Sequence, residues 1–275
     1  MVWRDPLRAA TPAFALSLYR RSRHALRSVI RAFAKVRTCR IRGITIRIGI
    51  SSEIEQFRAE SYATKEPETL DWLETNLRDC DVFMDVGANI GLYSLYAAKL
   101  KPSCTVYSFE PESQNFSRLC RNIVINALPN IIPCNFPLSD REAFDLFYVG
   151  TIQAGAALHS LGRPSDFRSQ ADGVALKQGA VAVTLDALVC KYGAPWPALL
   201  KIDVDGIEEK VIGGAETVLS SSKLRTILVE VSFRQKEDAM WAERTLNRFG
   251  YKLLRKSVWV EDMNGLKSQN YNFSR

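Results

Sequence analysis

The chain has 275 residues, of which 47% are apolar and 24% charged, and these values are typical of a soluble globular protein with a substantial core. No stretch approaches the roughly 20 apolar residues of a membrane-spanning helix, and the N-terminus lacks the apolar run of a secretory signal. Six cysteines without a CxxC pair and only two histidines argue against a zinc site. We therefore predict a cytoplasmic protein with reduced thiols.

The positive charge is concentrated in an N-terminal arm. Residues 1–47 contain 12 Lys and Arg side chains and a single acid, Asp5. Apolar and arginine side chains recur with helical spacing over residues 12–36, which predicts an amphipathic helix. This helix would contact an anionic membrane surface or an acidic partner, act as a targeting peptide, or pack as an accessory helix on the domain. We take residues 1–50 as the arm and residues 51–275 as the main domain.

Further elements are expected before the first central strand. Residues 40–50, RIRGITIRIGI, alternate apolar and basic side chains around Gly43, which predicts a strand or hairpin with one buried face. Ser52 and Glu55 have the spacing of a capping box, so a helix should begin there. Leucines along one side predict another helix over residues 67–77.

Residues 82–91, VFMDVGANIG, form the central motif. An apolar run long enough for a buried strand is followed by a turn with two glycines and then by helical spacing over residues 92–100. This is the layout of a nucleotide-binding βα unit. Gly87 would allow a tight turn, Asn89 tolerates left-handed backbone angles, and Gly91 would let the helix approach the sheet or a ligand. An ordinary tight turn in an α/β domain is the alternative.

Two more βα units follow. Residues 105–109 form a short strand that runs into Glu110, which lies 25 residues after Asp85 and is suitably placed to accept hydrogen bonds from ribose hydroxyls. After a helix, residues 131–138 predict a third strand, which runs into Asp140. Three such units in succession predict a parallel, doubly wound sheet.

The second half of the chain is less regular. Residues 144–149 and 181–185 are predicted strands, and the intervening segment 150–179 is predicted to be a long loop that carries His159, most simply as a solvated side chain. The other expected elements are a buried strand over 199–204, a helix over 208–219, a parallel strand over 226–233, a helix over 236–248 and a closing hairpin of 251–254 with 257–261.

Six short motifs occur in order: DVGANIG at 85–91, SFEP at 108–111, LSD at 138–140, TLDAL at 184–188, KIDVDGIE at 201–208 and VEVSF at 229–233. Together they resemble the FkbM family of S-adenosylmethionine-dependent methyltransferases, over residues 62–260. The resemblance implies a class I methyltransferase fold. That is a Rossmann-like α/β fold with a mostly parallel seven-stranded sheet, helices on both faces and an antiparallel last strand. The family usually reads DVEG where this chain has Asp205, whose shorter side chain reaches less far.

The resemblance also implies a site for S-adenosylmethionine at the carboxyl edge of the sheet. The implied contacts are Gly87, Asn89 and Gly91 with the methionine part, Asp85 with its ammonium group, Glu110 with the ribose hydroxyls and Asp140 with the adenine amino group. For Asp140, a turn-forming role is the alternative.

Four residues are candidates for the chemistry. Asp203 ends a central strand beside the expected transfer site and would act as general base or position an acceptor hydroxyl. Lys201 would pair with it and lower its pKa. Glu230, which we expect to end the neighbouring strand, and His159 are the other candidates. Asp203, Asp205 and Glu230 would alternatively bind a divalent cation, but we predict no metal site.

These features predict an O-methyltransferase acting on a hydroxyl of a sugar, glycan or small molecule. The acceptor class comes from the resemblance. The chain itself lacks the [ND]PP[YF] motif of base amino-group methylases, so no nucleic-acid partner is expected. The acceptor pocket is expected in the least patterned segments, 150–180 and the region before Asp85.

Two alternatives remain. A nucleotide-binding dehydrogenase would carry G-x-G-x-x-G, whereas this turn has Asn89. A non-catalytic module would use the basic arm to bind nucleic acid or a membrane. In either an enzyme or a module, the arm would place the protein at the periphery of an anionic membrane.

Overall fold

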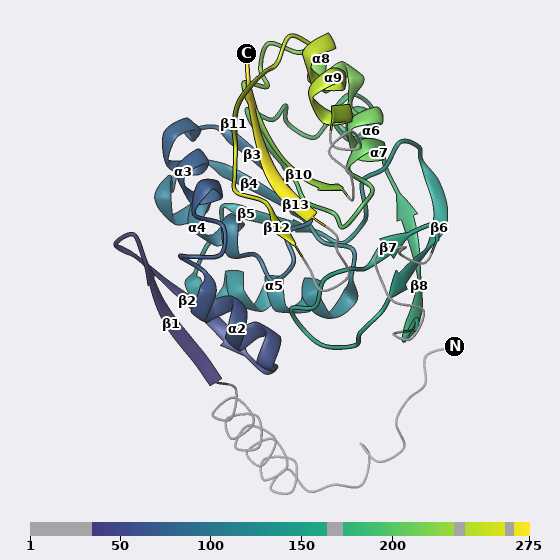
Figure 1. Ribbon diagram of the computed structural model, residues 1–275. Coiled ribbons are helices and arrows are strands. Elements are labelled where there is room, and N and C mark those ends of the chain that lie inside the picture. Colours follow the sequence, from purple (N-terminus) through teal and green to yellow (C-terminus); the bar gives the residue numbers. More distant parts are fainter. Residues whose placement is uncertain (1–34, 164–172, 234–239, 262–266) are drawn as a thin grey trace, which may run out of the picture.

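The computed structural model describes residues 35–163, 173–233, 240–261 and 267–275. Seven strands of its central sheet lie in the order β11-β13-β10-β9-β3-β4-β5, and the short β12 joins the same sheet as an eighth strand by pairing with β13 outside this path (Figure 1). β13 is antiparallel to both neighbours, and the five strands from β10 to β5 are parallel. The predicted mostly parallel seven-stranded sheet is therefore confirmed. The strands are β3 (Val82–Val86), β4 (Thr105–Phe109), β5 (Ile131–Cys134), β9 (Leu199–Ile202), β10 (Thr226–Phe233), β11 (Lys252–Lys256), β12 (Val260–Glu261) and β13 (Lys267–Ser274).

Helices cover both faces of this sheet (Figure 1). Successive residues of a strand point to opposite faces, so Phe83 packs into one core cluster and Met84 into the other. Leu199 and Leu200 of β9 divide in the same way. Parallel strands buried on both faces read as continuous apolar runs, which is why these strands could be predicted. The helices are α2 (Glu53–Ser61), α3 (Pro67–Asn76), α4 (Leu92–Leu100), α5 (Ser113–Asn126), α6 (Leu185–Cys190), α7 (Glu208–Gly213), α8 (Glu216–Ser220) and α9 (Met240–Arg248).

The hairpin of β1 (Lys35–Ile41) and β2 (Ile44–Ile50) is part of the main core. Ile46 and Ile48 are fully buried among residues of the sheet and α4. Asn122 of α5 accepts a hydrogen bond from the Gly49 amide at 2.9 Å. The sequence grouped this hairpin with the arm, whereas its packing places it with the domain. The predicted capping box of Ser52 and Glu55 is present at the start of α2. The predicted helix over 12–36 lies outside the described residues, except for its last two positions, which belong to β1.

A second sheet lies on the side of the molecule away from this hairpin (Figure 1). β6 (Ala143–Val149) pairs antiparallel with β7 (Ser160–Leu161) and with β8 (Leu176–Ala182). The prediction of an unbroken loop over 150–179 is therefore wrong at β7 and at the start of β8. β8 buries only alternate residues near its end, and Gly and Gln weaken its strand signal.

The C-terminal strands also differ from the prediction. The expected hairpin of 251–254 with 257–261 is wrong, because β11 and β12 each pair with β13, the strand between β10 and β11. β13 was missed because its sequence, KSQNYNFS, is mostly polar. Glu230 lies within β10 and not at its end. None of the helices described here is long and apolar enough to cross a bilayer.

Candidate functional site

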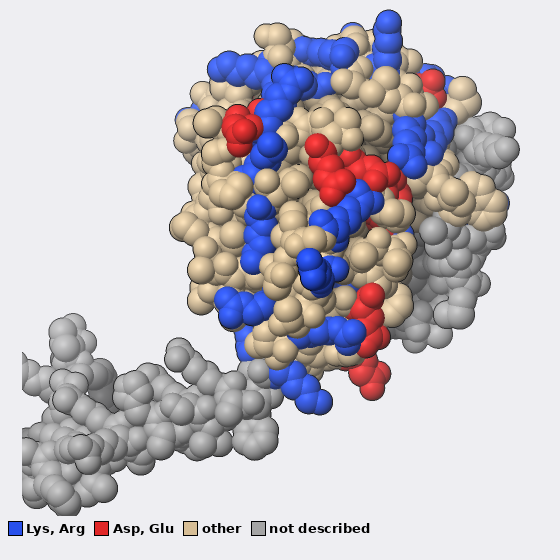
Figure 2. All heavy atoms as spheres, turned by 90° about the vertical axis from the view of Figure 1, so that its left-hand side faces the viewer, with Lys and Arg blue, Asp and Glu red and all other residues tan. Residues whose placement is uncertain are grey.

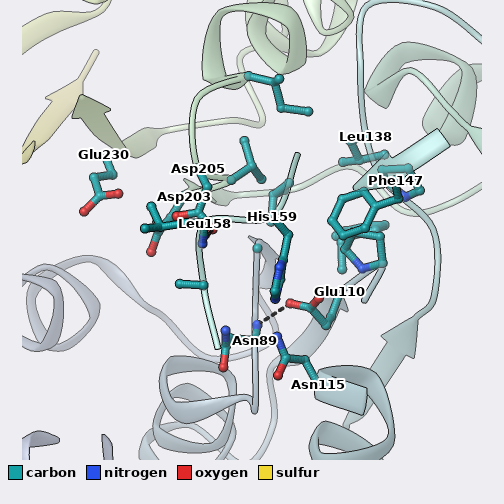
Figure 3. A pocket seen from close by; sticks show the side chains of 18 of the residues that line it. Asn89, Glu110, Asn115, Leu138, Phe147, Leu158, His159, Asp203, Asp205 and Glu230 are labelled. Carbon is teal, nitrogen blue, oxygen red and sulfur yellow. Dashed lines mark hydrogen bonds between the residues drawn. The ribbon is translucent and has the colours of Figure 1, made fainter. Parts of the chain in front are cut away.

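A cavity of about 250 Å³ lies at the carboxyl ends of β3, β4 and β9 (Figure 3). Its two ends differ in character. One end is apolar and is lined by Phe109, Phe136, Leu138 and Phe147. The other end is charged and is lined by Arg58, Lys65, Asp203, Asp205 and Glu230. Such an elongated cavity suits a ligand with an aromatic group at one end and charged groups at the other.

The glycine turn after β3 shapes the floor of this cavity. Gly87 has φ +86°, and a Cβ atom there would lie 1.6 Å from the carbonyl oxygen of Asp203. Only glycine therefore lets the loop after β9 approach so closely. Gly91 (φ +90°) starts α4, where a Cβ would lie 2.4 Å from Leu119 Cδ1. Gly87 and Asn89 line the cavity, whereas Gly91 packs against α5 and does not line it.

Glu110 lines the cavity between its two ends. Its Oε2 accepts a hydrogen bond from the Asn89 amide and its Oε1 one from the Glu112 amide, both at 2.8 Å. Burial raises the pKa of Glu110 to about 8, although these hydrogen bonds oppose the shift. When Glu110 is ionised, each oxygen retains a lone pair with which to accept a ligand hydroxyl.

Asp85 does not line the cavity. It is 1% exposed, and its Oδ2 accepts a hydrogen bond from Ser94 Oγ at 2.5 Å. Its Oδ1 lies 3.9 Å from Lys201 Nζ, and burial raises its pKa. The side chain lies behind Lys201, on the α4 face of the sheet, so it does not face the cavity. Its contact with the ammonium group of a ligand, directly or through water, stays a prediction.

Lys201 and Asp203 form the predicted ion pair, with Nζ 2.7 Å from Oδ2. Burial alone would raise the pKa of Asp203, but the charge and hydrogen bond of Lys201 outweigh burial and hold it below its ordinary value. Burial and the negative charge of Asp203 raise the pKa of Glu230 well above its ordinary value. The charged end thus combines a carboxyl group whose ionisation is favoured with one whose ionisation is disfavoured.

Asp205 connects this end to a strap that crosses the cavity, residues 154–159. Asp205 Oδ2 accepts a hydrogen bond from the Leu158 amide at 2.7 Å. Burial, and then the charge of Asp203, raise the pKa of Asp205 to about 6. Other hydrogen bonds that hold the strap come from Ser52 Oγ to the Ala154 carbonyl (2.6 Å), Arg58 Nε to the Gly155 carbonyl (2.6 Å) and Asn89 Nδ2 to the Ala156 carbonyl (2.8 Å).

His159 ends this strap and projects into the middle of the cavity (Figure 3). It is 5% exposed, and its ring centroid lies 6.2 Å from that of Phe147. The expectation of a solvated histidine is therefore wrong. Glu110 and Asn89 lie below it in this view, with Asp203 and Asp205 on one side.

Asp140 does not line the cavity. It is exposed, and its Oδ1 accepts a hydrogen bond from Ser139 Oγ at 3.2 Å. Leu138 and Phe147 line the apolar end and Asp140 does not, so its contact with adenine stays a prediction. Within the described ranges, no three His, Cys, Asp or Glu side chains are grouped to hold a metal ion, so the alternative cation site at Asp203 is not supported.

Arg58 and Lys65 were not singled out in the sequence. Both line the charged end, and Lys65 Nζ lies 2.9 Å from Glu66 Oε1. Their signal was weak, since a basic residue in an amphipathic or polar segment is usually solvated. Phe147 was missed for a similar reason, because it belongs to β6 outside the central sheet.

The chain is similar in sequence to known methyltransferases. The family profile described as "Methyltransferase FkbM domain" matches residues 85–253. The chain is 29% identical over 175 residues to the 31-O-demethyl-FK506 methyltransferase FkbM of Streptomyces tacrolimicus, covering 56% of this chain and 66% of that protein. It is 26% identical over 166 residues to the hexuronic acid methyltransferase AglP of Haloferax volcanii, covering 60% and 62%. The matches thus span slightly less than two thirds of each relative.

Solved structures match more distantly. A precorrin-6y C5,15-methyltransferase from Geobacter metallireducens has a TM-score of 0.46 at 15% identity, covering 77% of this chain and 88% of that one. The family match covers most of the chain and includes Asp85, Glu110, Asp203 and Glu230. The chain therefore belongs to the FkbM methyltransferase family, whose methyl donor is S-adenosylmethionine.

Proposed function

We propose that the protein transfers a methyl group from S-adenosylmethionine to a hydroxyl oxygen of a sugar or small-molecule acceptor. The observation that carries the proposal is that one cavity combines an apolar end, Glu110 in its middle and carboxylates of contrasting pKa at the other end. Pairs of acids whose environments separate their pKa values are typical of sites that move protons.

The residues along the cavity fit the donor from end to end. Leu138 and Phe147 suit an adenine ring, and Glu110 can accept ribose hydroxyls with its remaining lone pairs. Arg58 and Lys65 suit the carboxylate of the methionine part. The donor, when bound there, supplies an activated methyl group on a sulfonium.

The charged end can serve the acceptor. Asp203, ionised beside Lys201, can accept the hydrogen bond of an acceptor hydroxyl and orient it. Asp205, with a pKa of about 6, is ionised at neutral pH and can take the hydroxyl proton on its carboxylate. As the acceptor oxygen forms its bond to the methyl carbon, the carbon–sulfur bond breaks and S-adenosylhomocysteine leaves.

The relatives support an oxygen acceptor. One is named for a 31-O-demethyl substrate and the other for hexuronic acid. An activity screen with labelled donor tests the proposal against hydroxyl, amine and thiol acceptors of similar size. We expect label on oxygen. Transfer to nitrogen or sulfur alone, with oxygen acceptors unlabelled, would contradict the proposal.

A second proposal concerns location. Lys35, Arg37 and Arg40 are exposed on β1, directly after the basic arm, and Lys and Arg side chains are spread over the face that includes this hairpin (Figure 2). This arrangement favours peripheral contact of a cytoplasmic enzyme with an anionic membrane. We expect the full chain to sediment with vesicles that contain phosphatidylglycerol and not with neutral vesicles. Equal sedimentation with both would contradict the proposal.

A further inference from the structure

A small side pocket, of about 40 Å³, adjoins the charged end of the main cavity. Gly87, Asn89 and Asp203 line both, so the two meet where the glycine turn approaches the loop after β9. The other walls of the side pocket come from α2, from the segment that leads to α3 and from the first turn of α4. A ligand in the main cavity can extend a group into the side pocket at this corner.

Glu66 brings a carboxylate to the wall of the side pocket. It is 8% exposed, and although it directly precedes α3, its side chain makes no capping hydrogen bond with that helix. Lys65 Nζ lies 2.9 Å from its Oε1, whereas its Oε2 is buried and accepts no hydrogen bond from the part of the chain that the structure describes. Buried polar atoms nearly always have a partner, so Oε2 is available to a donor from outside the chain.

The neighbours of Glu66 leave this capacity open. Burial, and then the charge and hydrogen bonding of Glu66, raise the pKa of Tyr93, which also lines the side pocket, well above its ordinary value. The side chain of Lys65 is 49% exposed, so water shares its charge. A carboxylate can accept about four hydrogen bonds, and Lys65 and Tyr93 therefore leave room for a further N–H donor.

Asp85 is the other buried carboxylate near the glycine turn with an oxygen, Oδ1, that accepts no hydrogen bond from the described residues. That oxygen lies 3.9 Å from Lys201 Nζ, and Asp85 lines neither the main cavity nor the side pocket. Of these two acids, Glu66 is therefore the one that a ligand in the side pocket can contact directly.

The side pocket suits a group that carries both charges of an amino acid. Arg58 lines it, and the hydrogen bond from Arg58 Nε to the Gly155 carbonyl holds this side chain in place. A ligand carboxylate can bind to Arg58 and Lys65 while a ligand ammonium group binds to Glu66. With adenine at the apolar end and ribose at Glu110, the methionine part of the donor is the group that reaches this corner.

We propose that Glu66 binds the ammonium group of the methionine part of S-adenosylmethionine. Glu66 precedes residues 85–253, the segment that the family profile matches, so the family match does not assign it this role. The inference rests on the proposed function for the direction in which the donor lies, and it adds the residue that fixes the far end of the methionine part.

Calorimetric titration of the full chain at pH 7 tests this contact in the absence of any acceptor. The probes are S-adenosylhomocysteine and its deamino analogue, in which hydrogen replaces the ammonium group. We expect the wild type to bind S-adenosylhomocysteine at least about tenfold more tightly, since a charge-assisted hydrogen bond contributes about that much. Equal affinity for the two probes would overturn the inference, and this comparison needs no variant.

The variant Glu66→Gln keeps the size of the side chain and removes its charge. It should lose most of the preference for S-adenosylhomocysteine and keep the wild-type affinity for the deamino analogue. Glu68→Gln is the matched control, because Glu68 does not line the side pocket and Gln can also accept its hydrogen bond from Asn270. This control should keep the full preference.

Three results with the variants would overturn the inference. One is an undiminished preference in Glu66→Gln. Another is an equal loss of affinity for both probes in Glu66→Gln, which would indicate a purely structural role. The third is a preference lost in Asp85→Asn and kept in Glu66→Gln, which would assign the ammonium group to Asp85.

Turnover with labelled donor separates this inference from the proposed reaction. Label on nitrogen or sulfur alone, together with a preference that depends on Glu66, would contradict the proposed reaction and leave the ammonium contact standing. Label on oxygen, with the preference unchanged in Glu66→Gln, would uphold the reaction and overturn the contact.

Discussion

The Leu158 amide donates a hydrogen bond of 2.7 Å to the Asp205 carboxylate, and both residues have left-handed backbone angles, with φ of +61° and +58°. Such angles cost about 1–3 kcal/mol in a residue other than glycine. The bond therefore holds two strained segments together, the strap over the cavity and the loop after β9. Asp is among the residues that tolerate this conformation, and its short side chain suffices to reach the strap. The departure from DVEG thus has a structural role.

Replacing Asp205 by Asn should separate chemistry from structure. An Asn side chain still accepts the Leu158 hydrogen bond and tolerates a positive φ, but it cannot take a proton. We expect donor affinity to remain and kcat to fall by about 10²–10⁴-fold, the usual contribution of a general base. In the wild type, kcat should fall as the pH drops below about 6, where Asp205 becomes protonated. This fall should be absent from the pH profile of kcat in Asp205→Asn.

The control for this change is Asp140→Asn, which alters an exposed acid outside the cavity and should leave kcat and its pH profile as in the wild type. An unchanged kcat in Asp205→Asn would assign proton removal to another group, and His159→Ala would then be the next variant.

Replacing Lys201 by Met should destabilise the fold. Lys201 is 2% exposed and lies within 3.9 Å of both Asp85 and Asp203, so its loss leaves two carboxylates near each other without a cation. Removing one partner of a buried ion pair costs about 3–5 kcal/mol. We expect the free energy of unfolding, measured by urea denaturation at pH 7, to fall by this amount. At pH 4 the fall should be smaller, because the two carboxylates left without Lys201 can take up protons.

The double variant Asp85→Asn with Lys201→Met should recover part of the lost stability, because it also removes one buried charge. Full stability of the single Lys201→Met variant at pH 7 would show that the carboxylates do not depend on this cation.

The central strands were predictable because burial on both faces leaves continuous apolar runs, and because acids and glycines follow these strands at the carboxyl edge. An acid near the end of a strand can point to either face of the sheet, and the motif alone does not say to which. Asp85 shares the face of Phe83 and therefore turns toward α4 and Lys201, away from the cavity. Asp140 lies past the strand end and turns to solvent.

The rest of the site depends on long-range pairing that leaves little trace in local sequence. Phe147 and His159 reach the cavity only because β6 and β7 pair outside the central sheet. β13 brings Ser268 and Asn270 beside α3, although its polar sequence resembles a loop. Arg58 and Lys65, from the region before Asp85, line the charged end of the cavity. That this region supplies the acceptor pocket stays a prediction.

Glu110 should make stability depend on pH. The unfolded chain releases this proton near pH 4.5 and the folded chain near pH 8, so the folded state binds more protons between these values. Its contribution to the free energy of unfolding therefore falls as the pH rises from about 5 to about 8. The raised pKa values of Asp205, to about 6, and Glu208, to about 7, act in the same direction.

The variant Glu110→Gln should flatten this slope in urea denaturation at pH 5, 6.5 and 8, whatever its absolute stability. Asp140→Asn should retain the wild-type slope. An identical slope in wild type and Glu110→Gln would show that Glu110 does not hold its proton on folding.

Replacing Gly87 by Ala tests whether glycine at this position is needed for the stability of the fold, in addition to shaping the cavity. The new Cβ would lie 1.6 Å from the Asp203 carbonyl oxygen, which is backbone and cannot turn aside. Gly43 provides a matched control, since it has a similar φ of +88° and no atom within 4 Å of its Cβ position. We expect Gly43→Ala to lower the free energy of unfolding by about 1 kcal/mol, the cost of the backbone angle, and Gly87→Ala by at least about 3 kcal/mol. Similar losses in both variants would mean that the loop after β9 can move away from the turn, and that its closeness to Gly87 does not stabilise the fold.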